Sequence, residues 1–534
     1  MPFIKSDFFR SKEFKLFLTI WIIYIFYMQM FGASTAANSQ SALTAAIVNE
    51  GRFEIDTYRR VAGGGIAFYD GHYYSGQAPG ISFISVPLYI LSKPIINLLP
   101  QRIIDSLFDK LENYGESLPV DFYGNKRIPS NYLPDLSKRQ ILEYLIISGL
   151  ILPVFTTSLF SALTVLLLYL LLKRFTKNEK LRIIITILFA FGTIRFSIAT
   201  GFLQRPLAIF FMLAAFIILF KIRHKDLEPK RSTIFAAGML AGFSAWFDYF
   251  HILAAGLLFL YLLSFYIKTK TIETKGPKKL GILNLNKPKL FLLLSFIIGV
   301  SIPIILLSSY HYIILDSPFT TPYAYKLDGA HELSGILNIK LPSAGTLVYM
   351  SKFFLFSPII FLALYGVHKA LLKKDAFYHD ALAIVIFAIF TLIYASVLTF
   401  AYPSEIAPSF KRYMTPILPF IFIFLPYIFT GNRLLKKNKM KITFIFIGIV
   451  SIIMNWISAQ YAGIGGLRDF GLDDEQIIAV YNFLGNGPSS DFSSALANVL
   501  GGNVLLFQLI GLLTLSLIIF LIWGPYLLKH AHSR

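Results

Sequence analysis

The sequence contains about twelve apolar runs, each long enough to cross a lipid bilayer as an α-helix. They lie near residues 14–31, 140–172, 183–200, 205–220, 233–249, 251–267, 290–308, 350–371, 380–401, 413–430, 441–458 and 503–528. Only 15% of the 534 residues are charged and 56% are hydrophobic, too little polar surface for a soluble protein. The sequence therefore predicts an all-α polytopic membrane protein. The first run is too long for a signal-peptide core and lacks a cleavage site, so we expect it to stay as a helix.

Basic residues gather in alternate connections between these runs, and this alternation predicts the topology. With the N-terminus in the cytoplasm, the basic segments lie near residues 5–12, 173–182, 221–231, 268–289, 373–374, 433–441 and 529–534. The net charge of +20 then reflects cytoplasmic Lys and Arg beside anionic lipid, with no need for a nucleic-acid partner. We expect a multi-pass protein of the cell membrane with both termini in the cytoplasm.

One further apolar run, residues 81–100, does not fit the alternation. Counting it as a span would reverse every later connection and place most basic segments outside. We therefore predict an interfacial or re-entrant helix that is broken by Pro87 and Pro94. A linker-like cytoplasmic stretch, TKTIETKGPKKLGILNLNKPK at 269–289, divides the chain into two predicted modules. The N-terminal module, 1–270, has an external loop at 32–139, and the C-terminal module, 271–534, has external loops at 309–349, 402–412 and 459–502.

Chemically active side chains concentrate in the segments predicted to be external. The first loop is unusually polar for this chain, and it carries Glu50, Glu54, Asp56, Asp70, His72, Tyr73 and Tyr74. Later external turns add Gln204, Arg205, Asp248, His251, Glu405, Lys411 and Arg412. Acids and arginines on one membrane face suit a phosphate-bearing lipid substrate, because Arg binds phosphate with paired hydrogen bonds. A carboxylate there can deprotonate an acceptor hydroxyl.

Several of these residues have a structural explanation as well. Lys411 and Arg412 could extend toward lipid head groups, and Asp70 precedes a glycine, as turn residues often do. A single histidine such as His72 is more often structural than a metal ligand. The chain has no cysteine and no HxxxH or HExxH pattern. The sequence therefore requires no metal, although carboxylates could hold a divalent cation.

The first loop resembles the corresponding loop of the polytopic GT-C glycosyltransferases, which include protein O-mannosyltransferases and lipid A aminoarabinose transferases. The resemblance is carried by Glu50, Gly51, Ile55 and Asp56, then by YDGHYYS at 69–75 and APG at 78–80. Weaker similarities follow in order: GFSAWFDY at 242–249, LFSPIIFLALYG at 355–366 and PSFKRYMTPILPF at 408–420. The YDGHYYS block is the specific part.

This resemblance implies a GT-C-like fold with a catalytic N-terminal module and a catalytic carboxylate in the first external loop. It implies a sugar donor linked to polyprenyl or dolichyl phosphate, transfer to a glycan, lipid or protein acceptor, and inversion at the anomeric carbon. The sequence departs from the superfamily in two places. GASTAANSQ stands where an Asp-Glu pair is usual, and Gln77 stands where a lysine would meet the donor phosphate.

These departures shift the expected roles to other residues. We expect Asp56 or Asp70 to be the base, and Arg205, Lys411 or Arg412 to bind the donor phosphate. The remaining predicted donor-site residues are His72, Tyr73, Tyr74, Gln77 and Asp248.

Two other classes remain open: a flippase or other transporter, and a catalytically inactive protein of envelope assembly. A transporter predicts ionisable residues in mid-span and related halves, whereas the polar groups here lie in external segments and no repeat is visible.

Overall fold

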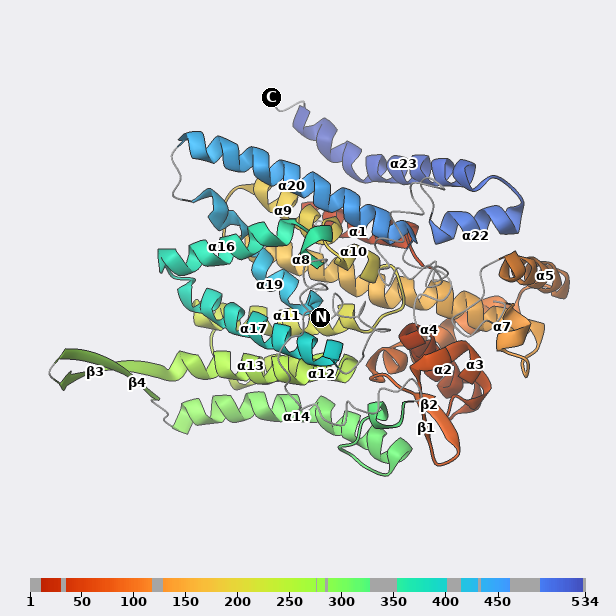
Figure 1. Cartoon of the computed structure of the whole chain (residues 1–534), viewed down its shortest axis with the longest axis horizontal. Helices are drawn as coiled ribbons and strands as arrows, with labels where there is room; N and C mark the ends of the chain where they lie inside the picture. The colour runs from red at the N-terminus through yellow and green to blue at the C-terminus, as the bar shows by residue number, and fades with distance from the viewer. Residues whose placement is uncertain are drawn as a thin grey trace.

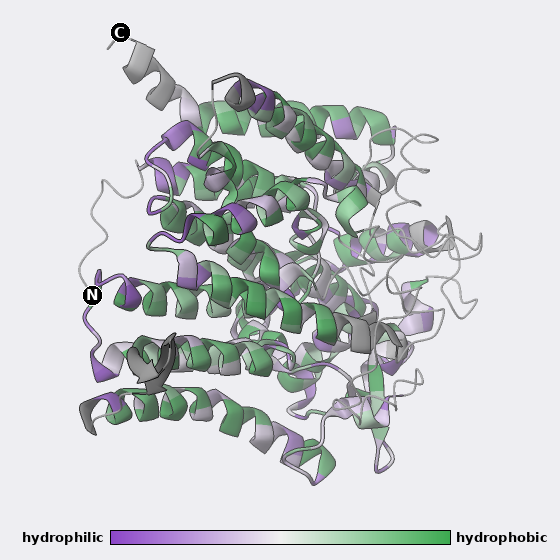
Figure 2. Ribbon diagram, turned by 60° about the vertical axis from the view of Figure 1, so that its left-hand side comes forward, coloured by the Kyte–Doolittle hydropathy of each residue, from purple (hydrophilic) through white to green (hydrophobic). Residues whose placement is uncertain are grey.

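Long α-helices make up most of the chain and run roughly side by side in the computed structural model (Figure 1). The structure describes residues 11–29, 35–117, 128–274, 276–283, 287–326, 353–400, 414–430, 434–461 and 490–531. Hydrophobic residues line the lengths of the helices, and hydrophilic residues gather at their ends (Figure 2).

The helices and strands follow one another along the chain. They are α1 (Lys12–Phe26), α2 (Thr35–Glu50), α3 (Arg59–Ala62), β1 (Ile66–Tyr69), β2 (His72–Ser75), α4 (Gly80–Asn97), α5 (Gln101–Ser117), α6 (Pro129–Tyr132), α7 (Lys138–Ile146), α8 (Leu159–Leu172), α9 (Glu179–Phe191), α10 (Arg195–Ile198), α11 (Arg205–Arg223), α12 (Arg231–Phe247), α13 (His251–Leu263), β3 (Ile267–Thr274), β4 (Gly276–Leu283), α14 (Lys287–Leu315), α16 (Ile359–Lys373), α17 (Tyr378–Phe400), α19 (Leu418–Phe422), α20 (Leu434–Tyr461), α22 (Asp491–Leu500) and α23 (Val504–Ala531).

Helix starts in this chain follow local capping chemistry. The Asn178 side chain accepts a hydrogen bond from the Leu181 N–H at 3.2 Å and caps α9. Ser137 and Gln140 form a reciprocal capping box at the start of α7. α7 continues through two π-helical turns into α8, so Lys138–Leu172 is one long helix.

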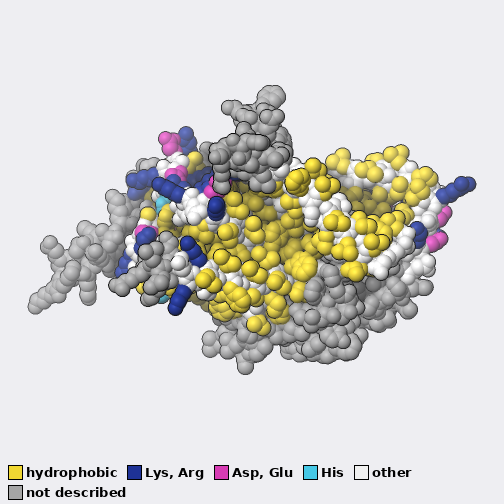
Figure 3. Space-filling model, turned by 90° about the horizontal axis from the view of Figure 1, so that it is seen from above, with side chains coloured by type: hydrophobic (Ala, Val, Ile, Leu, Met, Phe, Trp, Pro, Cys, Tyr) yellow, Lys and Arg dark blue, Asp and Glu magenta, His cyan; other side chains and the backbone are white. Residues whose placement is uncertain are grey.

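Six helices in the described part of the chain are long and apolar enough to cross a membrane. They are Gly80–Asn97, Lys138–Leu172, Arg205–Arg223, Lys289–Leu315, Asn438–Gln460 and Val504–Gly524. The face seen in Figure 3 is broadly hydrophobic, with charged side chains gathered at its two ends. A surface of this kind is stable against lipid and would not be against water, so the chain is a helical membrane protein.

Three of the connections predicted to be cytoplasmic, near residues 5–12, 173–182 and 221–231, meet at one end of the bundle, which we call the basic end. Lys12 pairs with Glu179 at 2.8 Å, and Arg174 pairs with Asp226 at 2.6 Å. The first loop lies at the opposite end, which we call the loop end (Figure 1). These connections therefore lie together, as the charge pattern predicts. The side of the membrane that each end of the bundle faces stays a prediction.

The prediction that Pro87 and Pro94 break the apolar run at 81–100 is wrong. α4 is a continuous helix from Gly80 to Asn97 with both prolines inside it. Each proline removes a single backbone donor, and packing can hold a helix together despite that loss. Tyr89, which lies between the prolines, is fully buried in the core that contains α2 and α7. Whether α4 spans the membrane stays a prediction from the charge pattern.

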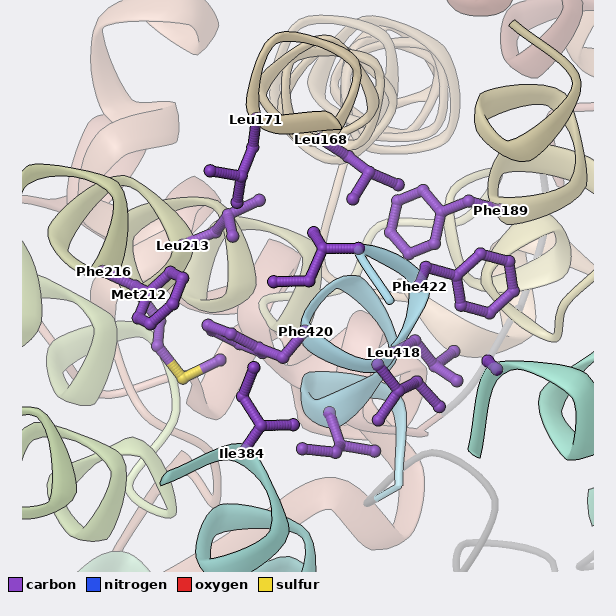
Figure 4. Close-up of a cluster of buried hydrophobic side chains, with 14 of the residues drawn as sticks. Leu168, Leu171, Phe189, Met212, Leu213, Phe216, Ile384, Leu418, Phe420 and Phe422 are labelled. Carbon is purple, nitrogen blue, oxygen red and sulfur yellow. The ribbon is translucent and has the colours of Figure 1, made fainter. Parts of the chain in front are cut away.

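The apolar run at 413–430 is not one long helix. Its described part, from residue 414 onward, forms a 3-10 turn at Thr415–Ile417, the short helix α19 and a second 3-10 turn at Leu425–Phe429. Prolines at 416, 419 and 426 prevent a continuous hydrogen-bond ladder. The segment is buried, and in Figure 4 side chains from α8, α9, α11 and α17 surround it. It fills the centre of the bundle, and we call residues 414–430 the central segment.

α12 and α14 pack with almost no space between their backbones. A Cβ added at Gly238 would lie 2.2 Å from the Phe296 carbonyl oxygen, and one at Gly299 would lie 2.3 Å from the Phe235 oxygen. Small residues spaced by four allow this approach between membrane helices, and Gly242 continues the pattern on α12. This close contact holds α12 and α14 in place, and the ends of both helices carry residues of the candidate functional site.

Candidate functional site

The first-loop motif forms a β-hairpin at the loop end of the bundle. β1 and β2 pair antiparallel, with Tyr69 opposite His72, and Asp70-Gly71 forms the two-residue turn. Both turn residues have positive φ, 48° for Asp70 and 83° for Gly71. Asp-Gly is a favoured pair for such a type I′ turn, because its twist matches that of the strands. Asp70 therefore occupies the turn position that its sequence suggests, and it is exposed to solvent.

Asp56 ties the preceding segment to this hairpin. Its Oδ2 lies 2.8 Å from the His72 Nδ1, and its Oδ1 accepts a hydrogen bond from the Tyr73 N–H at 2.8 Å. The neighbouring Ile55 N–H donates to the Tyr73 carbonyl at 2.7 Å. The hydrogen bond to Asp56 and its negative charge raise the pKa of the His72 imidazole. The pair joins a half-buried carboxylate to an exposed histidine.

From Tyr74, within β2, the chain runs into the protein and its side chains become buried. Burial raises the pKa of the Tyr74 phenol to about 12. Gln77 is buried, and its Oε1 accepts hydrogen bonds from Gln204 Nε2 at 3.4 Å and from the Tyr323 hydroxyl at 3.2 Å. Three segments that are distant in sequence therefore meet at Gln77.

The turns on either side of α11 and α12 place an ion pair beside this junction. Arg205 is the first residue of α11, directly after Gln204, and Asp248 follows the last residue of α12. The Arg205 Nε donates to the Asp248 Oδ2 at 3.1 Å, with both side chains at most 15% exposed. Asp248 Oδ1 also accepts the Phe250 N–H at 3.3 Å, which stabilises the tight turn into α13.

The segment after α14 contributes residues that sequence reasoning did not assign. Tyr323 lies in a 3-10 turn at Pro322–Tyr325, and Lys326 pairs with Ala67 of β1 through an isolated β-bridge. The Lys326 ammonium lies 4.8 Å from the centre of the Tyr323 ring, and the residue is 5% exposed. The sequence offers one signal for Lys326: it stands among aromatic residues (PYAYK) in a segment predicted to be external. That pattern does not indicate that the lysine is buried.

Two buried histidines lie near the junction, and neither was given a role in the predicted site. His311 Nε2 lies 2.9 Å from the Tyr249 hydroxyl, which joins α14 to the turn after α12. His251 is fully buried at the start of α13, and neither of its ring nitrogens has a hydrogen-bond partner. The sequence places His251 in the same predicted external turn as Asp248, three residues later.

The predicted site residues therefore divide into two groups. Gln77, Arg205 and Asp248 lie in the buried junction, where Gln204, Tyr323 and Lys326 join them. Asp56, His72 and Tyr73 form a second group at the outer end of β2, and Asp70 points to solvent in the turn. Lys411 and Arg412 lie outside the described residues. Within the described ranges, no cluster of three or more His, Asp or Glu side chains is arranged to hold a metal ion.

No family model and no curated protein sequence matches this chain. Among solved structures, it is similar to the archaeal oligosaccharyltransferase AglB from Archaeoglobus fulgidus in complex with an inhibitory peptide and a dolichol-phosphate. That match has a TM-score of 0.44 and 12% identity, and it covers 84% of this chain and 56% of that chain. The apo form gives a TM-score of 0.44 with 12% identity, and covers 86% and 57% of the two chains.

A complex of the same oligosaccharyltransferase with Zn and sulfate gives a TM-score of 0.41, 12% identity, and coverage of 89% and 58%. The chain thus spans little more than half the length of these structural neighbours, which are GT-C superfamily enzymes.

Proposed function

We propose that the chain is a membrane glycosyltransferase. It transfers a sugar from a polyprenyl- or dolichyl-phosphate-linked donor to an acceptor hydroxyl on the extracytoplasmic face. The observation that carries this proposal is the junction at Gln77. There the end of the first-loop motif meets Gln204, next to the Arg205–Asp248 pair, and meets Tyr323 from the segment after α14. A buried cation beside the motif suits a lipid phosphate that enters from the bilayer.

Arg205 binds the donor phosphate in this proposal. Its guanidinium donates a hydrogen bond from Nε to Asp248, and this bond helps to fix the plane of the group. As the glycosidic bond breaks, negative charge grows on the phosphate oxygen that leaves with the lipid. A fixed cation stabilises that charge with little reorganisation, especially where water is excluded.

Asp56 is the proposed base. Each carboxylate oxygen has two acceptor positions, so the bonds to His72 and Tyr73 leave one position on each oxygen. Asp56 takes the acceptor's proton while the acceptor oxygen attacks the anomeric carbon and the lipid phosphate leaves from the opposite face. The result is inversion at that carbon. We favour Asp56 over Asp70 because Asp70 is a turn residue exposed to solvent.

The proposal also requires movement of the hairpin. His72 and Ser75 are the ends of β2, about 10 Å apart at about 3.3 Å per residue. Asp56 lies at the outer end and the junction lies beyond the inner end. Attack at the anomeric carbon needs the base and the phosphate site within one sugar of each other. We therefore expect the hairpin to close toward Arg205 when the donor binds.

Sugar transfer by the purified chain in lipid nanodiscs tests the proposal. The donors are polyprenyl-phosphate sugars that carry a hexose or a pentose, and the readout is release of polyprenyl phosphate together with a glycosylated acceptor. Asp56→Asn is compared with Asp70→Asn as a matched control in the same loop. Transfer by wild type and by Asp70→Asn, with loss in Asp56→Asn, supports the proposal. Equal transfer by both variants contradicts the assignment of Asp56 as the base.

The transporter alternative predicts ionisable groups in mid-span. Asp380 is fully buried, but it lies at the first turn of α17, at the basic end of the bundle. It contacts His224 at 2.9 Å and accepts a hydrogen bond from Tyr261. This cluster joins α11, α13 and α17 as a structural contact. Movement of a sugar-lipid across liposomes without glycosyl transfer would favour the transporter instead.

A further inference from the structure

We propose that Lys326 forms, together with Arg205, the binding site for the phosphate of a lipid-linked ligand. This inference rests on the proposed use of a lipid-phosphate donor, and it adds a residue from a segment that the sequence did not connect with the site. A lipid-linked phosphate and free inorganic phosphate would offer the same group to these two cations. Comparing the binding of the two ligands separates these sources.

Backbone pairing holds Lys326 in place. Its bridge to Ala67 adds a third segment beside the β1–β2 hairpin. The nearby Tyr69 hydroxyl donates to Asp316 at 3.3 Å, and the Tyr69 and Tyr325 rings lie 4.8 Å apart. The segment after α14 is therefore attached to the hairpin at several points, which orients the Lys326 side chain before any ligand binds.

The side chain of Lys326 runs along the backbone of Gly76. A Cβ at position 76 would lie 2.7 Å from the Lys326 Cε and 2.8 Å from the Gly65 carbonyl oxygen. Glycine at 76 is therefore the residue that leaves room for the lysine stem. The next residue is Gln77, which carries an uncharged amide. The Lys326 cation, which comes from the segment after α14, thus lies beside the uncharged amide of Gln77.

The surroundings of the two cations suit an anion. Lys326 lies against the Tyr323 ring, and the Tyr323 hydroxyl and Gln204 both donate to Oε1 of Gln77. The Gln77 NH₂ group consequently points away from these two donors. Arg205 follows Gln204 directly and pairs with Asp248, and the ring of the next residue, Tyr249, lies 5.7 Å from the Tyr323 ring. Both cations therefore border the junction at Gln77. Attraction between charges is stronger there than in water, because the dielectric is lower and salt screens less.

Direct binding to the purified full-length chain in detergent micelles tests the inference. The probe is polyprenyl phosphate, and affinity is measured by native mass spectrometry. The uncharged polyprenol and inorganic phosphate are tested alongside. Loss of one charge-assisted hydrogen bond should weaken binding of polyprenyl phosphate about 10- to 100-fold in Lys326→Gln. Lys326→Arg should keep most of the affinity. Lys138→Gln, at an exposed lysine at the end of the first loop, should bind like wild type.

Gly76→Ala provides an independent variant, because its methyl group displaces the Lys326 side chain without changing any charge. It should weaken binding in the same direction as Lys326→Gln. Unfolding temperatures of all variants establish that each is folded. Affinity within twofold of wild type in folded Lys326→Gln would overturn the inference. Binding of inorganic phosphate as tightly as the lipid, or equal binding of polyprenol, would overturn the assignment to a lipid phosphate.

The result separates this inference from the proposed function. Binding of polyprenyl phosphate that depends on Lys326, in a protein that transfers no sugar from any donor, supports the site and contradicts the glycosyltransferase. Sugar transfer with an unchanged KM for the donor in Lys326→Gln contradicts the site and supports the glycosyltransferase.

Discussion

Replacement of Gly238 by alanine should destabilise the protein by forcing α12 and α14 apart. The added Cβ would lie 2.2 Å from the Phe296 carbonyl oxygen, whereas real contacts of this kind stay above 3.0 Å. The helices must therefore separate by at least 0.8 Å, the difference between these distances. The Cβ is fixed to the α12 backbone and the oxygen belongs to the α14 backbone, so no side-chain rotation can relieve the clash.

Overpacking of this kind costs about 1–3 kcal/mol. The higher helix propensity of alanine returns up to about 1 kcal/mol. Subtracting the full gain leaves a net loss of up to about 2 kcal/mol in the free energy of unfolding. Gly299→Ala should behave similarly, because its Cβ would lie 2.3 Å from the Phe235 oxygen.

Reversible unfolding in mixed micelles, followed by circular dichroism, measures this loss. Gly256→Ala in α13 is the matched control, because a Cβ there meets nothing within 4 Å. That variant should be neutral or stabilised by up to about 1 kcal/mol. The separation should also disturb the hydrogen bond between Tyr249 and His311, at the loop end of the same helix pair. Equal unfolding free energies for Gly238→Ala and Gly256→Ala would refute the close-packing argument.

Three further predictions concern the hairpin. Asp70→Val should destabilise the turn by about 1–2 kcal/mol, because a β-branched residue disfavours positive φ, and Asp70→Asn should be neutral in the same unfolding assay. The His72 pKa should lie above about 6.5 and fall toward it in Asp56→Asn, as an NMR titration would show. The stabilising effect of the pair is thus fully present below pH 6.5 and is lost as pH rises through the raised pKa; an unchanged His72 pKa in Asp56→Asn would contradict the contact. The chain has no native cysteine, so spin labels can be attached to cysteines placed at the exposed positions of Phe68 and Ile252. The distance between the two labels should shorten by several Å when donor binds, and an unchanged distance would argue against hairpin closure.

Helices and their approximate positions were largely predictable from the sequence. Apolar runs reveal helices because the bilayer imposes their length, and the basic connections at 173–182 and 221–231 do meet at one end. The Asp70-Gly71 turn was also readable, because that pair fits only a few backbone conformations. These features depend on local sequence or on charge alone.

Other features depend on contacts between distant segments. Prolines interrupt the apolar runs of both α4 and the central segment, 414–430, so the two runs look alike in sequence. Packing nevertheless keeps α4 continuous, whereas the central segment breaks into short turns. The same limit applies to the site. Lys326 reaches the junction through a bridge to Ala67, and no pattern within its own segment indicates that partner. Arg205 and Asp248 were recognised separately, but their 3.1 Å contact is a property of the fold.

Sugar transfer with a radiolabelled polyprenyl-phosphate sugar, using wild type and Asp56→Asn in nanodiscs, tests the central claim most directly. The proposed mechanism predicts transfer by wild type and a loss of about 100-fold or more without the base, with donor binding retained. Failure of wild type to transfer any lipid-phosphate-linked sugar, or full activity in Asp56→Asn, would contradict it.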